Sequence, residues 1–320
     1  MTDIQVRFDF VKNRKIFFTI SMVLLLVFLA LYLVNGAVMD VTFRGGTRML
    51  IECREKIDAN QAAVKLEQAL GKKVSTSVME TVSGAQGTTK KSIMLRIDVA
   101  SENPLTGEEE QLVRSTLVNE GFPVITDSPN NEVASIEPSI GRETLGKGLL
   151  AVGISSVLIL IYIAWRFSVM SGLSAALSAV IALVHDCLVM LGIYVAFRIP
   201  FNDVFIAAIL TIIGYSINDT IILYDRIREN AGIMQKSDIG TIINVSIWQT
   251  LPRTINTTVT TLISVVVLYI FAAANSITSL TGFSLSLMVG CIAGTYSSVF
   301  IAANLWYWWR SKRMKAKHAN

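Results

Sequence analysis

The chain has 320 residues, of which 52% are hydrophobic and only 16% are charged, and its mean hydropathy is +0.54. Soluble domains carry about 25% charged residues, so this composition excludes a protein that is soluble along its whole length. The formal net charge of +4 is unevenly distributed, because the stretch from Asp40 to Glu143 has an acidic excess and the remainder is basic. We expect the basic part to contact the lipid bilayer and not to bind nucleic acid.

Six apolar runs are long enough to cross a membrane, whose hydrocarbon core of about 30 Å takes about 20 helical residues. These runs cover residues 16–34, 147–165, 172–197, 204–224, 251–274 and 284–306. The first run follows a basic stretch and could be a secretory signal, but it is longer than the roughly 7 to 15 residues of a signal h-region, and no A-x-A-like cleavage site follows. We therefore predict a polytopic α-helical membrane protein with six transmembrane helices, the first uncleaved.

Three basic clusters predict how the spans are oriented across the membrane. They are Arg7, Lys12, Arg14 and Lys15 before the first span, Arg226, Arg228 and Lys236 after the fourth, and Arg310, Lys312, Arg313, Lys315 and Lys317 after the sixth. With six spans, all three clusters fall on one side, and Lys and Arg are enriched in cytoplasmic segments. Residues 1–15 and the basic tail 307–320 are therefore predicted in the cytoplasm. Residues 35–146 are then outside, which is the periplasm in a Gram-negative bacterium.

The segment 35–146 has the pattern of an α+β domain inserted between the first two membrane helices. Alternating apolar residues predict strands over 48–53, 74–81 and 92–99 and from Val124 onward. Helical periodicity predicts helices over 59–70 and 107–119, the first of which ends at Gly71, a typical C-terminal cap. Two strand-helix-strand units of this size favour a ferredoxin-like fold.

The cysteines indicate neither a metal site nor a disulfide. Cys53, Cys187 and Cys291 show no metal-binding spacing, and the last two lie in predicted spans, where burial makes a thiol inert. The inserted domain also shows no His, paired carboxylates or phosphate-binding loop. We predict no catalytic residue, no cofactor and no metal, and expect this domain to bind or move.

The charged or imidazole residues that lie well inside the predicted spans are His185, Asp186, Asp219 and Arg253. A charge near the bilayer centre costs from about 2.5 to above 10 kcal/mol, so each is a functional candidate. Asp219 and Arg253 enter the membrane from the same side on neighbouring antiparallel helices, and we expect them to pair. Such a pair could release and take up protons by separating and rejoining, or it could be static and fix the helix register. His185 and Asp186 either join this path or hydrogen-bond across helices.

Two further patterns lie on the last two spans. Arg253, Thr257, Thr260, Thr261 and Ser264 form a polar stripe at helical spacing on the fifth, which suits a hydrated path or a helix contact. The sixth has small residues at Ser286, Gly290, Gly294 and Ser298, a spacing that lets helices approach closely. Pro252, directly before Arg253, predicts a start or a kink of the fifth helix.

Four sequence blocks carry a resemblance to a known family. FRGGT at 43–47, VHD at 184–186, GYSINDTIILYDRIREN at 214–230 and SLSLMVGCIAGTYSSVFIA at 284–302 closely resemble the SecD/SecF family of bacterial protein-export proteins, within the resistance-nodulation-division transporter superfamily. The resemblance covers nearly the whole chain, with the blocks in the same order.

The resemblance implies an accessory protein of the SecYEG translocon that uses the proton motive force, with protons as the coupling ion, to move exported preproteins across the inner membrane. The resemblance also implies that Asp219, Arg253 and Asp186 are proton-path residues. We regard His185, Asn218 and Thr257 as secondary candidates for the same path. The FRGGT block, comprising Phe43, Arg44, Gly45, Gly46 and Thr47, takes a structural role at the base of the domain, where its glycines allow a tight backbone.

The family also implies partners. GYSINDT occurs once in the chain, whereas the superfamily works with two six-span halves, so a separate SecD chain is expected to supply the other half. YajC, YidC and, functionally, SecA are further expected partners. Half of a proton-driven small-molecule or lipid exporter and a non-pumping structural subunit remain alternatives. An intramembrane hydrolase fits worst, because His185 and Asp186 lack a nucleophile partner or an HExxH-type motif.

Overall fold

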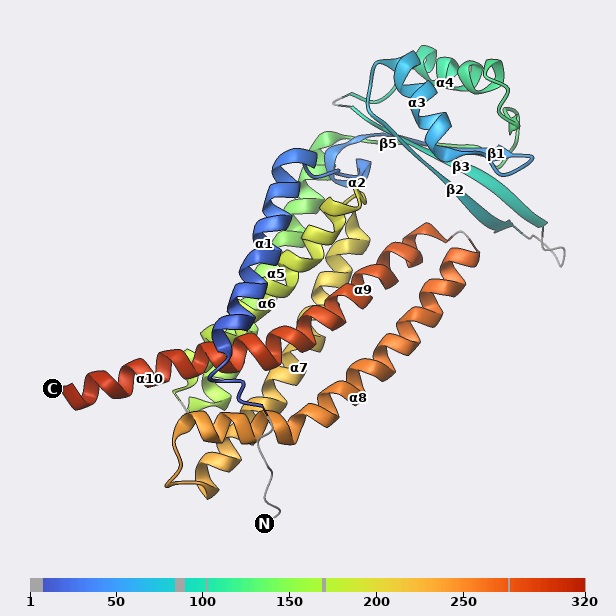
Figure 1. The fold of residues 1–320 in the computed structure, drawn as a ribbon. Helices are drawn as coiled ribbons and strands as arrows, with labels where there is room; N and C mark the ends of the chain where they lie inside the picture. The colour runs from blue at the N-terminus through green and yellow to red at the C-terminus, as the bar shows by residue number, and fades with distance from the viewer. Residues whose placement is uncertain (1–7, 84–89, 102, 169–170, 276, 320) are drawn as a thin grey trace.

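The computed structural model describes residues 8–83, 90–101, 103–168, 171–275 and 277–319. The chain forms a bundle of long helices and a smaller sheet-containing part, whose residues are inserted between the first and second long helices (Figure 1).

Six helices in the described part of the chain are long and apolar enough to cross a membrane. They are α1 (Arg14–Asn35), α5 (Pro138–Arg166), α6 (Gly172–Ala196), α7 (Asp203–Ile233), α8 (Ile239–Ala274) and a last helix formed by α9 (Thr278–Tyr296), the π-helix η2 (Ser297–Ala302) and α10 (Ala303–Ala319). The prediction of six membrane-length helices is confirmed. In the most apolar 18-residue stretch of each helix, 50% of the residues are buried in α6 and α7 and 61% in the last helix, against 6% in α1 and α5. The helices α6, α7 and the last helix therefore form the centre of the bundle.

All of these helices except α6 extend beyond the predicted spans, because hydropathy reports where apolar side chains stop and not where the helix stops. α8 shows this best, since it begins at Ile239, where the side chain of Asp238 accepts hydrogen bonds from two backbone N–H groups. Pro252 lies inside α8, so the expectation that it starts this helix is wrong. The added first turns pack on the N-terminal segment, where the side-chain oxygen of Asn244 accepts a 2.9 Å hydrogen bond from Phe10 N–H.

In its described residues, the sheet-containing part has five antiparallel strands and two covering helices. The strands are β1 (Gly46–Cys53), β2 (Val74–Ser83), β3 (Lys90–Ala100), β4 (Val124–Ile125) and β5 (Glu132–Ile136), in the order β2-β3-β1-β4, with β5 also paired to β1. Helices α3 (Ala59–Leu70) and α4 (Gly107–Asn119) lie on the face away from the membrane helices (Figure 1). Both helices were predicted with these bounds, and the long strands to within two residues. Their shared core includes Met49, Ile51, Leu66, Leu95 and Val113.

The FRGGT block forms the junction between the sheet and the membrane helices. It comprises the end of the short helix α2 (Val41–Arg44) and the start of β1. Gly45 and Gly46 have φ of 83° and 135°, and a Cβ on them would lie 2.6 Å from Pro138 and 2.2 Å from the carbonyl oxygen of Val99. Thr47 is buried, and its hydroxyl accepts a 2.9 Å hydrogen bond from Leu105 N–H. Only glycine fits this close approach of three backbone segments.

An ionic network ties the same junction to the underside of the sheet, the face opposite α3 and α4. Asp40 pairs with Arg48 and Arg96 at 2.7 Å each, and Asp98 pairs with both arginines at 2.6 Å. Burial lowers the pKa of the Arg96 guanidinium, but the carboxylates of Asp98 and Asp40 outweigh this effect, and the pKa is raised above its ordinary value. Asp40 also accepts a hydrogen bond from Thr42 N–H at the start of α2.

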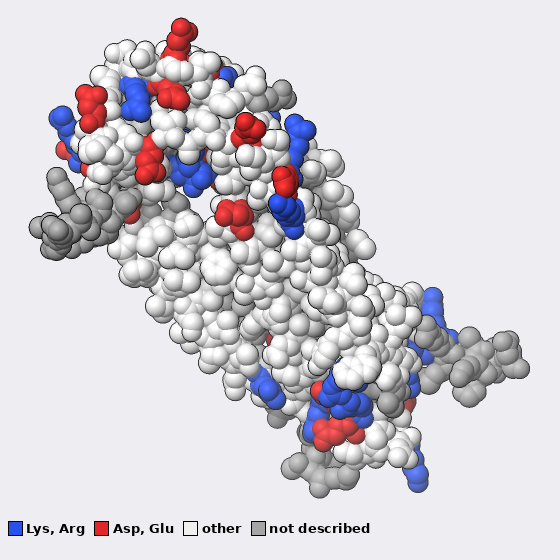
Figure 2. All heavy atoms as spheres, turned by 180° about the vertical axis from the view of Figure 1, so that it is seen from behind, with Lys and Arg blue, Asp and Glu red and all other residues white. Residues whose placement is uncertain are grey.

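Charged side chains lie mainly at the two ends of the molecule. Figure 2 shows them gathered over the sheet-containing part and at the opposite end, with a band between that has few charges. At the opposite end, Asp225 of α7 pairs with Arg166 and Arg228, each at 2.9 Å. This distribution fits a protein whose middle band lies in hydrocarbon.

Candidate functional site inside the helix bundle

A carboxylate at the centre of the bundle is held by two hydroxyl groups from other helices. Asp186 of α6 is 1% exposed, and its Oδ2 accepts hydrogen bonds from Ser216 of α7 at 2.7 Å and from Ser297 of η2 at 2.8 Å. Its Oδ1 lies 3.3 Å from Nδ1 of His185. The three central helices therefore meet at one carboxyl group.

A second set of hydroxyl contacts continues from this carboxyl group along α7. The Ser298 hydroxyl donates to the carbonyl oxygen of Ser216 at 3.0 Å and lies 2.8 Å from the hydroxyl of Thr220. Both Ser297 and Ser298 belong to the π-helix, whose wider turn places two successive hydroxyls against α6 and α7. Single π-helical turns recur at functional sites in other proteins.

His185 connects this cluster to the first helix. Its Nε2 is buried and has no hydrogen-bond partner, while its ring lies against Tyr296, with 6.0 Å between the ring centroids. The Tyr296 hydroxyl donates to the carbonyl oxygen of Phe17 at 2.8 Å and accepts from Ser21 at 3.2 Å. The imidazole thus lies between the central carboxylate and α1.

Asp219 lies one turn from Ser216 on α7 and is also buried, at 2% exposure. Its Oδ2 is buried without a hydrogen-bond partner. Buried polar atoms are nearly always satisfied, and a carboxyl oxygen without a protein partner is satisfied by a proton or by water. Asp186, bonded by hydroxyls, and Asp219, with an unsatisfied oxygen, are therefore two buried acids in different environments.

Asp219 and Arg253 do not form the direct ion pair that we expected. No contact within 4.0 Å joins their charged groups, although Arg253 is the charged side chain that acts electrostatically on Asp219. The reason is rotation about the α8 axis, because Arg253 is exposed while its neighbour Thr254 is the residue that packs inward. Their positions along the two helices predicted a similar depth in the membrane, but depth does not determine which face of a helix a side chain occupies.

The polar stripe of α8 likewise lies away from the bundle centre. The hydroxyls of Thr257, Thr260, Thr261 and Ser264 each donate to a carbonyl oxygen of the preceding turn, at 2.8 to 3.1 Å. Thr260 and Ser264 are exposed, as is Asn218 on α7. Of the three secondary candidates, Asn218 is therefore exposed and Thr257 is half-buried, whereas His185 belongs to the buried cluster around Asp186.

Gly290 and Gly294 bring α9 against α7 beside the cluster. A Cβ at Gly290 would lie 2.3 Å from Ile212, and one at Gly294 would lie 2.9 Å from Cβ of Ser216. Their small size therefore allows the close approach that places Ser297 within reach of Asp186.

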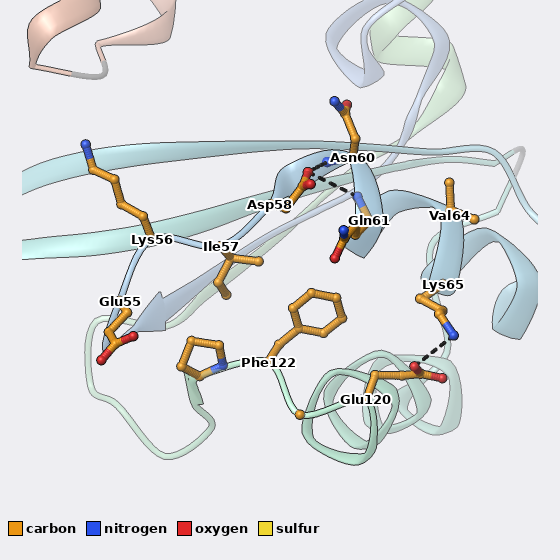
Figure 3. Close-up of a pocket in the computed structure, with 12 residues that line it drawn as sticks. Glu55, Lys56, Ile57, Asp58, Asn60, Gln61, Val64, Lys65, Glu120 and Phe122 are labelled. Carbon is orange, nitrogen blue, oxygen red and sulfur yellow. Dashed lines mark hydrogen bonds and ion pairs between the residues drawn. The ribbon is translucent and has the colours of Figure 1, made fainter.

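Outside the bundle, a pocket of about 670 Å³ lies between the start of α3 and the end of α4 (Figure 3). Phe122 and Ile57 point into it, and most of its charged groups are already engaged, with Lys65 paired to Glu120 at 2.9 Å, Lys56 paired to Glu80 at 3.0 Å and Asp58 accepting from two N–H groups of α3. Within the described residues, no group of three or more His, Cys, Asp or Glu could hold a metal ion.

Sequence reasoning missed the hydroxyl partners of the cluster, namely Ser216, Thr220, Ser297 and Ser298. Ser216 and Thr220 lie within the GYSINDT block, at one-turn spacing from each other. Ser298 was assigned to close packing alone, and nothing in the apolar pattern distinguishes a π-helical turn from an α-helical one.

These features define a multi-pass membrane protein that holds ionisable groups inside its helix bundle. Residues 118–312 match the family described as protein export membrane protein SecD/SecF, C-terminal. The chain is 32% identical to the protein translocase subunit SecF of Thermobaculum terrenum over 95% of its own length and 94% of that protein, and 37% identical to SecF of Rickettsia bellii over 93% and 92%. The chain belongs to the SecD/SecF family.

Larger relatives contain a region similar to this chain as one part. It is 33% identical to the protein translocase subunit SecDF of Bacillus subtilis over 98% of its own length, but covers only 40% of that protein. A crystal structure of SecDF from Thermus thermophilus, described as a translocon-associated membrane protein, superimposes with a TM-score of 0.75 at 26% identity, again over 97% of this chain and 40% of the other. The chain therefore corresponds to one part of SecDF and to almost the whole of SecF.

Proposed function

We propose that this chain is a SecF-type subunit that, with SecD, couples the proton motive force to late-stage translocation of preproteins across the bacterial inner membrane. The match over nearly the full length of SecF proteins supports this assignment. The fused SecDF relatives support SecD as the partner, because the part that this chain lacks is present in them on the same polypeptide.

The buried acid Asp219 is the observation that carries the proton-coupling proposal. It lies in the bundle with an unsatisfied oxygen, within the electrostatic influence of Arg253. Moving one charge across a potential of 100 mV is worth about 2.3 kcal/mol, enough to bias a domain motion of modest cost. We infer that Asp219 exchanges the proton and that the Asp186 cluster, with His185, is the next group along the path.

The exposed polar face formed by Arg253, Thr260 and Ser264 of α8 and Asn218 of α7 supports a second half beside this chain. Such side chains are costly against lipid, and interhelical polar contacts would satisfy them. We infer that SecD covers this face and completes the surroundings of Arg253.

The orientation of the chain and its other partners belong to the same proposal. The basic clusters favour cytoplasmic termini, which puts the domain formed by residues 35–146 in the periplasm. Its strand order β2-β3-β1-β4 with two helices on one face is that expected of a ferredoxin-like domain. SecYEG, with YajC, YidC and SecA, would be the machinery on which the pair acts, and its role would be transport without catalysis or a cofactor other than protons.

Reconstitution tests the proposal. The chain is purified from membranes to determine whether a second six-span protein accompanies it, and the two are then placed in liposomes with and without a translocating preprotein. We expect copurification and a proton flux that requires both chains and rises with the preprotein. A chain that purified alone and conducted protons alone would contradict the assignment as half of a transporter.

A further inference from the structure

Strand β2 has an outer edge that pairs with no other strand in the described part of the chain. The sheet order is β2-β3-β1-β4, and β2 is ten residues long, with all ten paired to β3 on its other side. Figure 1 shows β2 as the strand nearest the outer ends of α8 and α9. An open edge of this length is a template for another extended chain.

The hydrogen-bonding groups along this edge can be assigned from their neighbours. The N–H of Val74 donates to the side chain of Glu67 at 3.1 Å, whereas the carbonyl oxygen of Lys73 accepts from Ala100 of β3 at 3.2 Å. Because an antiparallel strand alternates between residues that bond inward and outward, Thr76 and Val78 direct their backbone groups to the outer edge. No hydrogen bond from the N–H of either residue to another part of the described chain is present.

A trough runs beside this edge, between the sheet and the membrane helices. It consists of two cavities of about 570 and 620 Å³, which share Asp40, Ser75, Thr76, Asp98 and Pro200 as lining residues. The second is bounded by Ser77 and Val78 on the sheet side, and by residues of α7 and α9 on the membrane side. A volume of this size is typical of ligand-binding clefts.

The sheet side of the trough is polar. Arg48 and Arg96, which face it from the sheet, are both paired with Asp40 and Asp98. Ser75 and Ser77 add hydroxyl groups at the edge strand itself. Further charged residues line the trough away from these pairs, namely Arg44, Lys73 and Arg198 in the first cavity and Asp203 in the second. Beside Thr76 and Val78 the trough therefore offers hydroxyl groups and paired charges, which suit the polar backbone of an extended peptide.

The edge has few of the features by which proteins prevent strand addition. Natural edge strands carry Pro, Lys, inward-pointing charges or bulges, whereas β2 reads VSTSVMETVS and pairs continuously with β3. Its one charged residue, Glu80, lies towards the end of the strand and pairs with Lys56 at 3.0 Å. The stretch around Thr76 and Val78 therefore remains suitable for pairing with another extended chain.

We propose that the outer edge of β2 binds an extended segment of the exported polypeptide as an added strand, using the backbone groups of Thr76 and Val78, with the trough accommodating its side chains. This inference rests on the proposed function, because it takes the polypeptide in transit as the ligand. Backbone pairing is independent of sequence, as a site for many different exported chains requires. A permanently bound partner protein fits this trough less well, because obligate protein–protein interfaces are more apolar than this serine-lined trough.

Cross-linking during translocation tests the site. Ser77→Cys, facing the trough, and Ser115→Cys, on α4 at the far side of the sheet, are each labelled with a thiol-reactive photocross-linker in membranes that contain the full chain and its partner. Cys53 and Cys291 are buried and Cys187 lies within α6, which keeps background labelling low. With a stalled preprotein, we expect at least about fivefold more adduct from Ser77→Cys than from Ser115→Cys. Equal adducts, or an adduct to SecD in place of the preprotein, would overturn the proposal.

A second pair of variants tests the backbone contact. Val78→Pro removes the outward N–H without breaking the ladder to β3, since Pro is tolerated at outward positions of edge strands, and Val78→Ala keeps the N–H while trimming the same side chain. In the Ser77→Cys background, we expect the adduct to fall about fivefold with Val78→Pro and less than twofold with Val78→Ala. Equal effects of the two variants would contradict strand addition.

Proton-dependent export measured in the same membranes separates the two proposals. If this chain supports proton-dependent export and Ser77→Cys gives no preferential adduct, the β2 site is wrong and the proposed function stands. If export in these membranes does not depend on this chain, the proposed function fails, whatever the cross-linking shows.

Discussion

The hydroxyl of Ser297 lies 2.8 Å from Oδ2 of Asp186, so the π-helical turn in the last membrane helix is bound to the carboxylate of α6. Ser216 of α7 reaches the same oxygen at 2.7 Å. A change in the charge of Asp186 would therefore alter its hydrogen bonds both to α7 and to the turn that connects α9 to α10. This arrangement links a buried ionisable group to helix packing.

Removing these two hydroxyls is the first test of the cluster. Hydrogen bonds to a charged group are each worth about 1.5–3 kcal/mol, so we expect Ser216→Ala/Ser297→Ala to slow proton-dependent export at least about tenfold. Thr211→Ala is the matched control, because its hydroxyl is exposed and bonds only within α7. Similar export rates for the two variants would show that Asp186 does not depend on its serine partners.

Close packing of α9 on α7 predicts a difference between two glycine substitutions. Gly290→Ala would place a Cβ 2.3 Å from Ile212, whereas Gly214→Ala on α7 meets nothing within 4 Å. Overpacking costs about 1–3 kcal/mol, while alanine is favourable in an open helical position. We expect thermal unfolding in detergent to occur at a lower temperature for Gly290→Ala and at an unchanged or higher one for Gly214→Ala. The reverse order would contradict the packing.

The helices and the inserted domain were largely predictable from sequence because their signals are local. Long apolar runs, the Gly71 cap and strand alternation each depend on neighbouring residues, and α3 and α4 begin and end where predicted. The candidate acids were also found, since a carboxylate in an apolar run is conspicuous.

The partners of those acids were not predictable, because they depend on how helices rotate and pack. Depth along the span suggested a direct contact between Asp219 and Arg253, but the rotation of α8 turns Arg253 outward. Ser297 reaches Asp186 only through a π-helical turn, and apolar periodicity carries no signal for such a turn.

The ionic network at the domain base predicts a loss of stability in Asp40→Asn. Asparagine still caps α2, but Arg48 and Arg96 each lose one carboxylate. Breaking a buried pair costs about 3–5 kcal/mol, and because these arginines are partly exposed we expect a smaller loss, roughly 1–2 kcal/mol, in chemical unfolding of the domain. Asp58→Asn, which changes an exposed cap of α3, should cost much less, and an equal loss would show that the network adds nothing.

Burial of Cys53 predicts slow, pH-dependent alkylation. Burial, with the nearby charge of Glu52, raises the pKa of this thiol to about 11, so at pH 8 roughly one molecule in a thousand carries the reactive thiolate. We expect iodoacetamide to modify Cys53 at least about a hundredfold more slowly than the exposed cysteine of Ser115→Cys, with the rate rising as pH increases towards 11. Mass spectrometry of the intact chain measures both rates, and equal rates at pH 8 would contradict a buried thiol.

The final prediction separates a proton-exchanging Asp219 from a static ion pair. Asp219→Asn and Arg253→Ala should each reduce proton-dependent export to background while leaving membrane insertion intact, with Glu108→Gln, at the exposed first turn of α4, as the control. A static pair would instead make both variants less stable, by several kcal/mol for a buried pair. Because no direct contact joins the two side chains, we expect unfolding temperatures within a few degrees of the parent chain. Normal late-stage translocation in either variant would exclude the exchange role, and a large loss of stability without loss of proton dependence would favour the static pair.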